Sequence, residues 1–189
     1  MVKKENQRIL LTKRMLQEGL IQLLETKSLE AISVTELCRV SGINRATFYN
    51  HFTSPLNLLN SIEEKTVEDL SRIIHNPRTP SEVLAHVEGV CEYFHDHAKT
   101  ILTLHNCHAD TRITKTLYMV NQDFQLYRLN DKFTRYAPSA KEEGLHLIST
   151  FFYTGCYHML LEWLRNGIQA TPKEIAKLMI TLARDNFLA

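Results

Sequence analysis

The chain has 189 residues, of which 44% are hydrophobic and 23% are charged, the composition of an ordinary globular protein. No apolar run approaches the roughly 18 residues of a membrane span, and no secretory signal follows the charged N-terminus, so we expect a cytoplasmic protein. The net charge of +1 does not by itself indicate a nucleic-acid partner, but residues 1–60 carry eight basic and five acidic side chains, against 14 and 16 in the remainder.

Helical periodicity dominates the chain from its start, and no segment alternates convincingly with period two, so we predict an all-α fold. The first part should contain a long helix, two short ones and a second long one, at about 5–27, 34–41, 45–51 and 55–74. Ser54 is placed to cap the last of these helices, with Pro55 in its first position.

Two strong helix-start signals follow, Thr79-Pro80-Ser81-Glu82 and Thr171-Pro172-Lys173-Glu174. In each, threonine caps the helix, proline occupies the first turn, and glutamate reaches back to the cap. Asn166-Gly167 is a plausible helix end. The predicted helices of this part start near Pro80 and then cover about 98–106, 111–134, 140–165 and 172–186, which makes nine in all.

The segment 33–52 is the most informative part of the sequence. Two short helices that cross steeply with almost no linker need a small residue at the crossing, such as Cys38, and a turn residue that tolerates positive φ, such as Gly42. Asn44 is a good N-cap for the second helix. Three apolar side chains are spaced to meet in one small core: Leu37, Ile43 and Phe48. The segment therefore predicts a helix-turn-helix.

The second short helix presents side chains that can donate hydrogen bonds, and none of them is acidic: Arg45, Thr47, Tyr49, Asn50 and His51. Arg45 and Thr47 lie near its N-terminus, where a recognition helix meets base edges and phosphates. The alternative is an ordinary helical hairpin with a glycine turn, but a merely solvated face usually includes Asp and Glu. We therefore predict sequence-specific DNA binding.

From Ile32 to Phe52, and on to Leu58-Leu59, the sequence resembles the DNA-binding domain of bacterial TetR-family transcription regulators. Its most specific part is Asn44-Arg45-x-Thr47-Phe48-Tyr49-x-His51-Phe52. A weaker resemblance, at Phe152-x-x-Gly155, Glu162-Trp163-Leu164-x-x-Gly167 and Thr171-Pro172-x-Glu174, is to the C-terminal domains of a subgroup that includes regulators of dihydroxyacetone kinase genes.

This resemblance implies an all-α homodimer with a DNA-binding domain at 1–53 and a regulatory and dimerisation domain at 54–189. It implies phosphate contacts from Ser33, Thr35, Tyr49 and His51 and base contacts from Arg45 and Thr47. Together with Asn44 and Asn50, these are the predicted DNA-binding residues. Many members have a lysine at the start of the fourth helix, where this chain has Thr53-Ser54-Pro55, and a glycine where it has Ser28.

The resemblance also implies that the last two helices pair with their symmetry mates. Apolar residues there follow three- and four-residue steps, although such stripes can also face the chain's own core. The predicted pairing residues are Ile148, Phe152, Gly155, Met159, Trp163, Ile175, Leu178 and Leu182.

The predicted function is that of a repressor whose operator affinity is changed by an effector bound to the C-terminal domain. An activator or co-regulator controlled by a partner protein is the alternative. We expect most aromatic and methionine side chains of the C-terminal part to lie in the hydrophobic core rather than to line a ligand pocket. No residue is therefore assigned to effector binding.

The histidines and cysteines suggest a remote alternative, an all-α metal-dependent hydrolase that uses the His95–His108 region. However, His95 and His97 diverge on a helix, and the chain has no nucleophile elbow, phosphate loop or dinucleotide fingerprint. The scattered residues Cys38, Cys91, Cys107 and Cys156 favour buried free thiols over a disulfide framework or a zinc ribbon. We therefore expect no catalytic residue, no cofactor and no metal.

Overall fold

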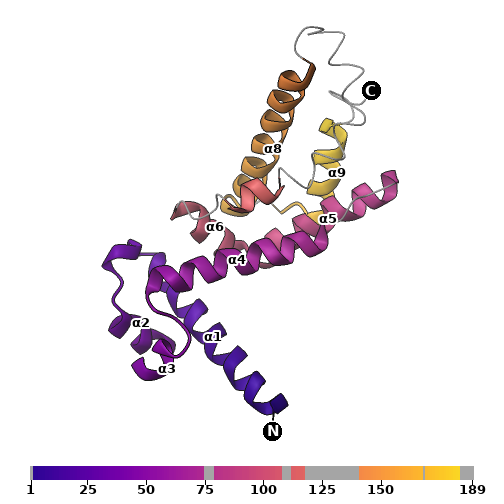
Figure 1. Ribbon diagram of the computed structural model, residues 1–189. Coiled ribbons are helices and arrows are strands. Elements are labelled where there is room, and N and C mark those ends of the chain that lie inside the picture. Colours follow the sequence, from indigo (N-terminus) through magenta and orange to yellow (C-terminus); the bar gives the residue numbers. More distant parts are fainter. Residues whose placement is uncertain (1, 75–78, 108–111, 118–140, 168, 184–189) are drawn as a thin grey trace. The chain divides into compact units, whose positions relative to one another are not determined.

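The computed structural model (Figure 1) describes residues 2–74, 79–107, 112–117, 141–167 and 169–183, except for a few side chains in helices. The described residues form helices and turns without a strand. Residues 112–117 are helical and belong to the helix predicted over 111–134, whose residues 118–134 lie outside the described ones. The described residues therefore hold nine α-helices, and the all-α, nine-helix expectation is confirmed. No helix within these ranges is long and apolar enough to cross a membrane.

The chain divides into two compact units, Met1–Thr66 with Lys99–Asp110, and Val67–Ala98 with Thr111–Ala189. The first unit holds α1 (Val2–Leu24), a 3-10 turn η1 (Leu29–Ala31), α2 (Val34–Ser41), α3 (Arg45–Tyr49) and α6 (Ala98–Asn106), and α4 (Pro55–Ile73) is shared by both. The largest fully buried side chains of the first unit form its core: Leu16, Leu20, Leu37, Phe48, Leu58, Ile101 and Leu104.

Helix α1 ends at Leu24, three residues earlier than predicted. The Lys27 amide donates to the Leu23 carbonyl at 3.1 Å and closes the helix, and Ser28 is the N-cap of η1, which the periodicity did not predict. Many TetR-family members have a glycine at this position. Here Ser28 has an extended backbone and caps the short turn η1 instead.

Close packing of α1 against α2 depends on a glycine that the sequence pattern did not single out. A Cβ added at Gly19 would lie 2.2 Å from Ser41 Oγ and 3.4 Å from Ser41 Cα. No side chain fits there unless Ser41 moves, so Gly19 allows the two helices to approach. Cys38, the small residue expected at the crossing of α2 and α3, is 5% exposed.

Helix α6 belongs to the first unit although it follows α5 in sequence. Ile101 and Leu104 are fully buried, and Lys99 Nζ lies 2.8 Å from Glu25 Oε1 at the end of α1. The compact units therefore do not divide between residues 53 and 54, and the functional boundary placed there stays a prediction.

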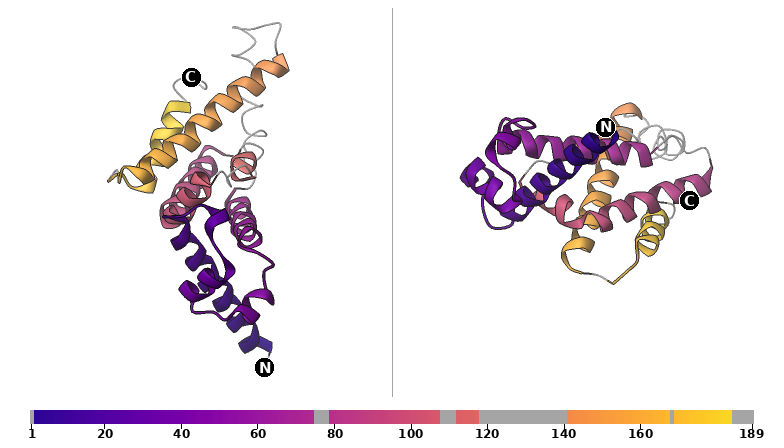
Figure 2. Two further views of the ribbon diagram at one scale, coloured as in Figure 1. Left: turned by 90° about the vertical axis from the view of Figure 1, so that its left-hand side faces the viewer. Right: turned by 90° about the horizontal axis from the view of Figure 1, so that it is seen from below.

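The second unit contains α5 (Pro80–Asp96), α8 (Lys141–Arg165) and α9 (Pro172–Ala183), and the chain turns back between α8 and α9 (Figure 2). Both predicted start signals are confirmed as reciprocal caps. The Glu82 amide donates to Thr79 Oγ1 at 3.3 Å, and the Glu174 amide donates to Thr171 Oγ1 at 3.3 Å. In return each glutamate carboxylate accepts from the threonine amide. Gly167, with φ of +56°, follows the end of α8 as predicted.

Helix α5 contacts both α8 and α9. The Phe94 ring meets Tyr157 edge-on with the centroids 6.2 Å apart, and Trp163 of α8 is 3% exposed. Trp163 Nε1 donates to the Ala170 carbonyl at 3.0 Å, which ties the end of α8 to the segment before α9. The core of this unit is therefore built on the α5 side of α8.

Candidate nucleic-acid interface

The turn between α2 and α3 has the predicted geometry. Gly42 adopts φ of +67° and ψ of +22°, and the Ile43 amide donates to the Cys38 carbonyl at 3.0 Å. Leu37 and Phe48 are fully buried and Ile43 is half-buried. Since a left-handed residue here closes α2 and starts the turn within one residue, the two helices cross with almost no linker.

Two of the predicted DNA-binding residues are helix caps. Ser33 Oγ accepts from the Glu36 amide at 3.1 Å, and Asn44 Oδ1 accepts from the Thr47 amide at 2.7 Å. Each cap uses an acceptor atom only, so the Ser33 hydroxyl hydrogen and the Asn44 side-chain NH₂ keep their donors for another partner. The same residues can therefore fix the helix starts and donate to an anion.

Helix α3 presents the remaining predicted residues on a surface without an acidic side chain. Arg45 and Asn50 are exposed, Tyr49 is 51% exposed, and Thr47 and His51 are half-buried. The Tyr49 ring leans edge-on against buried Phe48, with the centroids 5.4 Å apart. Arg45 makes no ion pair within the described part of the chain, so its guanidinium is available.

The acidic residue nearest to this surface in sequence, Glu36 of α2, is paired. Lys27 Nζ lies 2.6 Å from Glu36 Oε1, which offsets a negative charge in the first turn of α2. On the same helix Thr35 and Arg39 are both exposed and stand four residues apart, on one face. Arg39 was not among the predicted contacts, although its spacing from Thr35 was a signal that could have identified it.

The start of α4 lacks the family's frequent lysine and has a polar cap instead. Ser54 Oγ accepts from the Asn57 amide at 3.1 Å, as predicted for a cap, and Asn57 Oδ1 accepts from the Thr53 amide at 3.2 Å. This start carries no cationic side chain, so a phosphate here would depend on backbone amides and on the hydroxyl hydrogens of Thr53 and Ser54.

The predicted pairing residues are divided between the core and the surface of the second unit. Trp163 and Ile175 are 3% and 6% exposed and belong to the core, and Met159 is half-buried. Gly155, Leu178 and Leu182 are exposed, whereas the side chains of Ile148 and Phe152 lie outside the described ones. The structure adds Leu147 and Phe151, which are 69% and 71% exposed.

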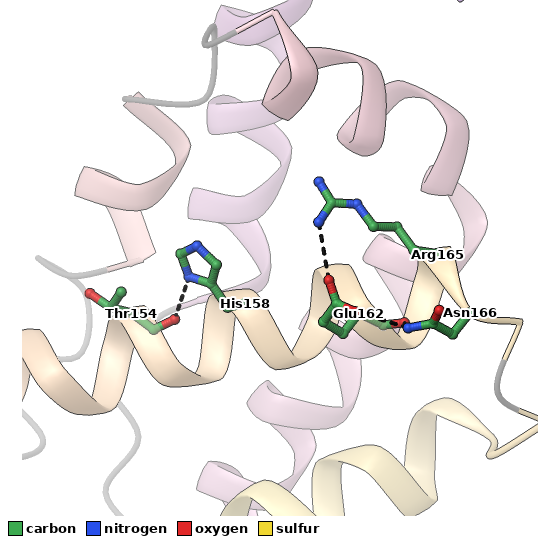
Figure 3. Close-up of polar contacts among 5 residues, drawn as sticks. All are labelled: Thr154, His158, Glu162, Arg165 and Asn166. Carbon is green, nitrogen blue, oxygen red and sulfur yellow. Dashed lines mark hydrogen bonds and ion pairs between the residues drawn. The ribbon is translucent and has the colours of Figure 1, made fainter.

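The exposed face of α8 continues as a polar row toward its C-terminus (Figure 3). His158 Nδ1 lies 2.8 Å from the Thr154 carbonyl, and Glu162 accepts from Arg165 and Asn166 at 3.1 and 2.9 Å. The hydrogen bonds from Asn166 and then Arg165 hold the pKa of Glu162 below its ordinary value. One face of α8 is therefore apolar in its first half and charged in its second.

The histidines of the remote hydrolase hypothesis have ring partners. His95 stacks on Trp163 with the centroids 5.7 Å apart, and His97 stacks on Tyr93 at 4.1 Å. Within the described ranges no three His, Cys, Asp or Glu side chains are grouped to hold a metal ion. His108 lies outside those ranges.

Comparisons with known proteins give the family. The family model TetR_C_8, described as "Transcriptional regulator C-terminal region", matches residues 81–185. No curated protein matches the chain.

Among solved structures, the chain is similar to a TetR-family transcriptional regulator from Bordetella parapertussis 12822, with a TM-score of 0.63 and 14% identity over 93% of this chain and 95% of the other. It is similar to the fatty acid degradation regulator FadR from Bacillus halodurans, with a TM-score of 0.58 and 13% identity over 90% and 93%. The dihydroxyacetone kinase operon activator DhaS gives a TM-score of 0.56 and 15% identity over 93% and 96%.

At these identities the solved structures show the fold alone, but the family model spans more than half of the chain. The hydrolase hypothesis is wrong, because the matched family consists of transcriptional regulators and not of enzymes. The chain belongs to the TetR family of transcriptional regulators.

Proposed function

We propose that the chain binds operator DNA as a homodimer through α3, and that occupancy of its C-terminal part changes operator affinity, so that it acts as a repressor. The observation that carries the proposal is the acid-free surface that begins at the Asn44 cap and holds an unpaired Arg45. The N-terminal end of a helix in the major groove is where base edges come within reach.

The residues of this surface have different tasks in the proposal. Arg45 reads a base edge, because a guanidinium makes two parallel hydrogen bonds to guanine O6 and N7. Tyr49 and His51 hold phosphates, as does the donor left on Ser33 by its cap, and such contacts set the register without carrying sequence information directly. Pairing of Glu36 with Lys27 reduces repulsion of the DNA backbone beside them.

Dimerisation is proposed to use the exposed apolar side chains of α8 and α9. Phe151 is 71% exposed on α8, and Leu178 and Leu182 are 47% and 43% exposed on α9. A Cβ added at Gly155 would meet no described atom within 4 Å, so this part of α8 can receive a neighbouring backbone. In a symmetric dimer these side chains of both protomers would be buried, and the two α3 helices would face two half-sites.

Effector coupling is proposed to run through α6 as well as α4. Only His97 separates the end of α5 from the start of α6. Because α6 belongs to the first unit and Lys99 pairs with Glu25, the residue after α1, a shift of α5 would pass along the chain through His97 to the unit that carries α3. An effector that prefers one position of α5 then changes the population competent for DNA.

Activation is the second candidate, since one structural relative is described as an operon activator. Under this alternative, a partner protein rather than a small molecule controls the C-terminal part. The DNA-binding half of the proposal is the same in both cases.

The experiment is selection of bound DNA fragments by the purified chain, followed by a salt-dependent titration of the enriched sequence. We expect a twofold-symmetric site with half-sites about one helical turn apart, and affinity that falls steeply with salt. Fragments without a shared motif would contradict the proposal. A reporter gene behind the selected site then separates repression from activation.

A further inference from the structure

Three sulfur-bearing side chains from three helices lie in one region of the second unit: Cys91 of α5, Cys156 of α8 and Met179 of α9. Cys91 Sγ lies 3.8 Å from Met179 Sδ, which is hydrogen-bonding distance for two sulfur atoms. Cys91 stands one turn before Phe94, and the Phe94 ring meets Tyr157, the residue after Cys156. This contact sets this part of α8 against α5, and Cys156 lies near enough to Cys91 to act electrostatically on its thiol.

We propose that Cys91, Cys156 and Met179 form a binding site for a soft monovalent metal ion, with Cu(I) as the biological candidate. Thiolates and thioethers are the ligands that Cu(I) prefers, and no role in the proposed function uses any of these sulfurs. Structural zinc sites usually take four protein ligands, so a set of three sulfurs favours Cu(I) over Zn²⁺. The proposal concerns metal binding alone and holds whether or not the metal changes operator affinity.

The burial of the three side chains suits a site that is closed but reachable. Cys91 is fully buried, whereas Cys156 and Met179 are half-buried, so an ion can enter past the latter two. The contacts of α5 with both α8 and α9 hold the three helices that contribute the ligands.

Binding must displace protons from the thiols. Burial raises the pKa of both Cys91 and Cys156 to about 12, and the neighbouring Cys156 thiol and the carboxylates of Glu88 and Glu92 contribute to the effect at Cys91. Both groups are therefore protonated thiols at neutral pH, and each thiol that binds Cu(I) as a thiolate releases one proton to solvent.

The test is an anaerobic competition for Cu(I) between the reduced protein and a chromogenic Cu(I) chelator at pH 7. We expect one Cu(I) per chain in the wild type and in Cys107→Ala, a matched control because Cys107 is a half-buried thiol of the first unit. Cys91→Ala and Cys156→Ala should bind at least roughly a hundredfold more weakly. Met179→Leu conserves volume and should weaken binding with the fold retained.

Circular dichroism of each variant shows whether it is folded. Met179→Leu conserves volume and Cys156 is only half-buried, so these two variants test metal binding even if Cys91→Ala disturbs the core. Equal affinity of Cys91→Ala, Cys156→Ala and wild type would overturn the proposal. So would a wild type that does not compete with the chelator.

Discussion

The substitution Leu178→Glu tests whether α9 forms part of a dimer interface. Leu178 is 47% exposed in the single chain, so about half of its side chain is available to be buried by a partner. Full burial of a leucine contributes about 1.5–3 kcal/mol, so half of it, counted once in each protomer, gives roughly 1.5–3 kcal/mol per dimer. This corresponds to a dimer about tenfold to a hundredfold weaker, before the cost of placing two carboxylates in an apolar interface is added.

Leu84→Glu is the matched control. Leu84 lies on α5 of the same unit and is 37% exposed, so the chemical change and the degree of exposure are similar. We expect sedimentation to show a wild type and a Leu84→Glu variant that are dimers, and a Leu178→Glu variant that is a folded monomer. The variant should also lose most of its operator affinity in a DNA titration, although residues 1–60 are unchanged, because two half-sites are no longer bound together.

Three results would refute this reasoning. A monomeric wild type would remove the dimer, and equal weakening by Leu84→Glu would assign the effect to the second unit as a whole. A monomeric Leu178→Glu variant with full operator affinity would separate dimerisation from DNA recognition.

Three further predictions concern the operator site, the packing of α1 and the role of metal. Arg45→Ala should cost about 1–3 kcal/mol of binding and relax base preference at one position, whereas Tyr49→Phe should weaken all sequences alike; identical titrations for both variants and wild type would contradict the assignment. Gly19→Ala places a methyl 2.2 Å from Ser41 Oγ. Thermal unfolding should therefore show Gly19→Ala less stable than wild type by about 1–3 kcal/mol, and equal stability would mean that α1 and α2 separate easily. Treatment with EDTA should leave operator binding and helicity unchanged, and loss of either would restore a structural metal site to consideration.

Local signals in the sequence predicted the helix starts and turns correctly. The caps at Asn44, Thr79 and Thr171 and the left-handed turns at Gly42 and Gly167 each depend on residues within about one turn. Their hydrogen bonds are the same wherever the helix is packed, so pattern alone was sufficient. The helix-turn-helix follows from the same kind of signal, because its turn and its caps lie within 20 residues at 33–52.

Other features needed the tertiary structure, because they depend on which helix meets which. Helix α8 is apolar on most of its circumference, so three- and four-residue steps could be drawn along more than one face; only packing against α5 shows that Trp163 is buried while Phe151 is exposed. The close approach at Gly19 depends on Ser41 of another helix, and the pairing of Lys99 with Glu25 joins residues 74 positions apart in sequence. Periodicity within one helix specifies that a face will be buried, but the partner that covers it is chosen only when the helices assemble.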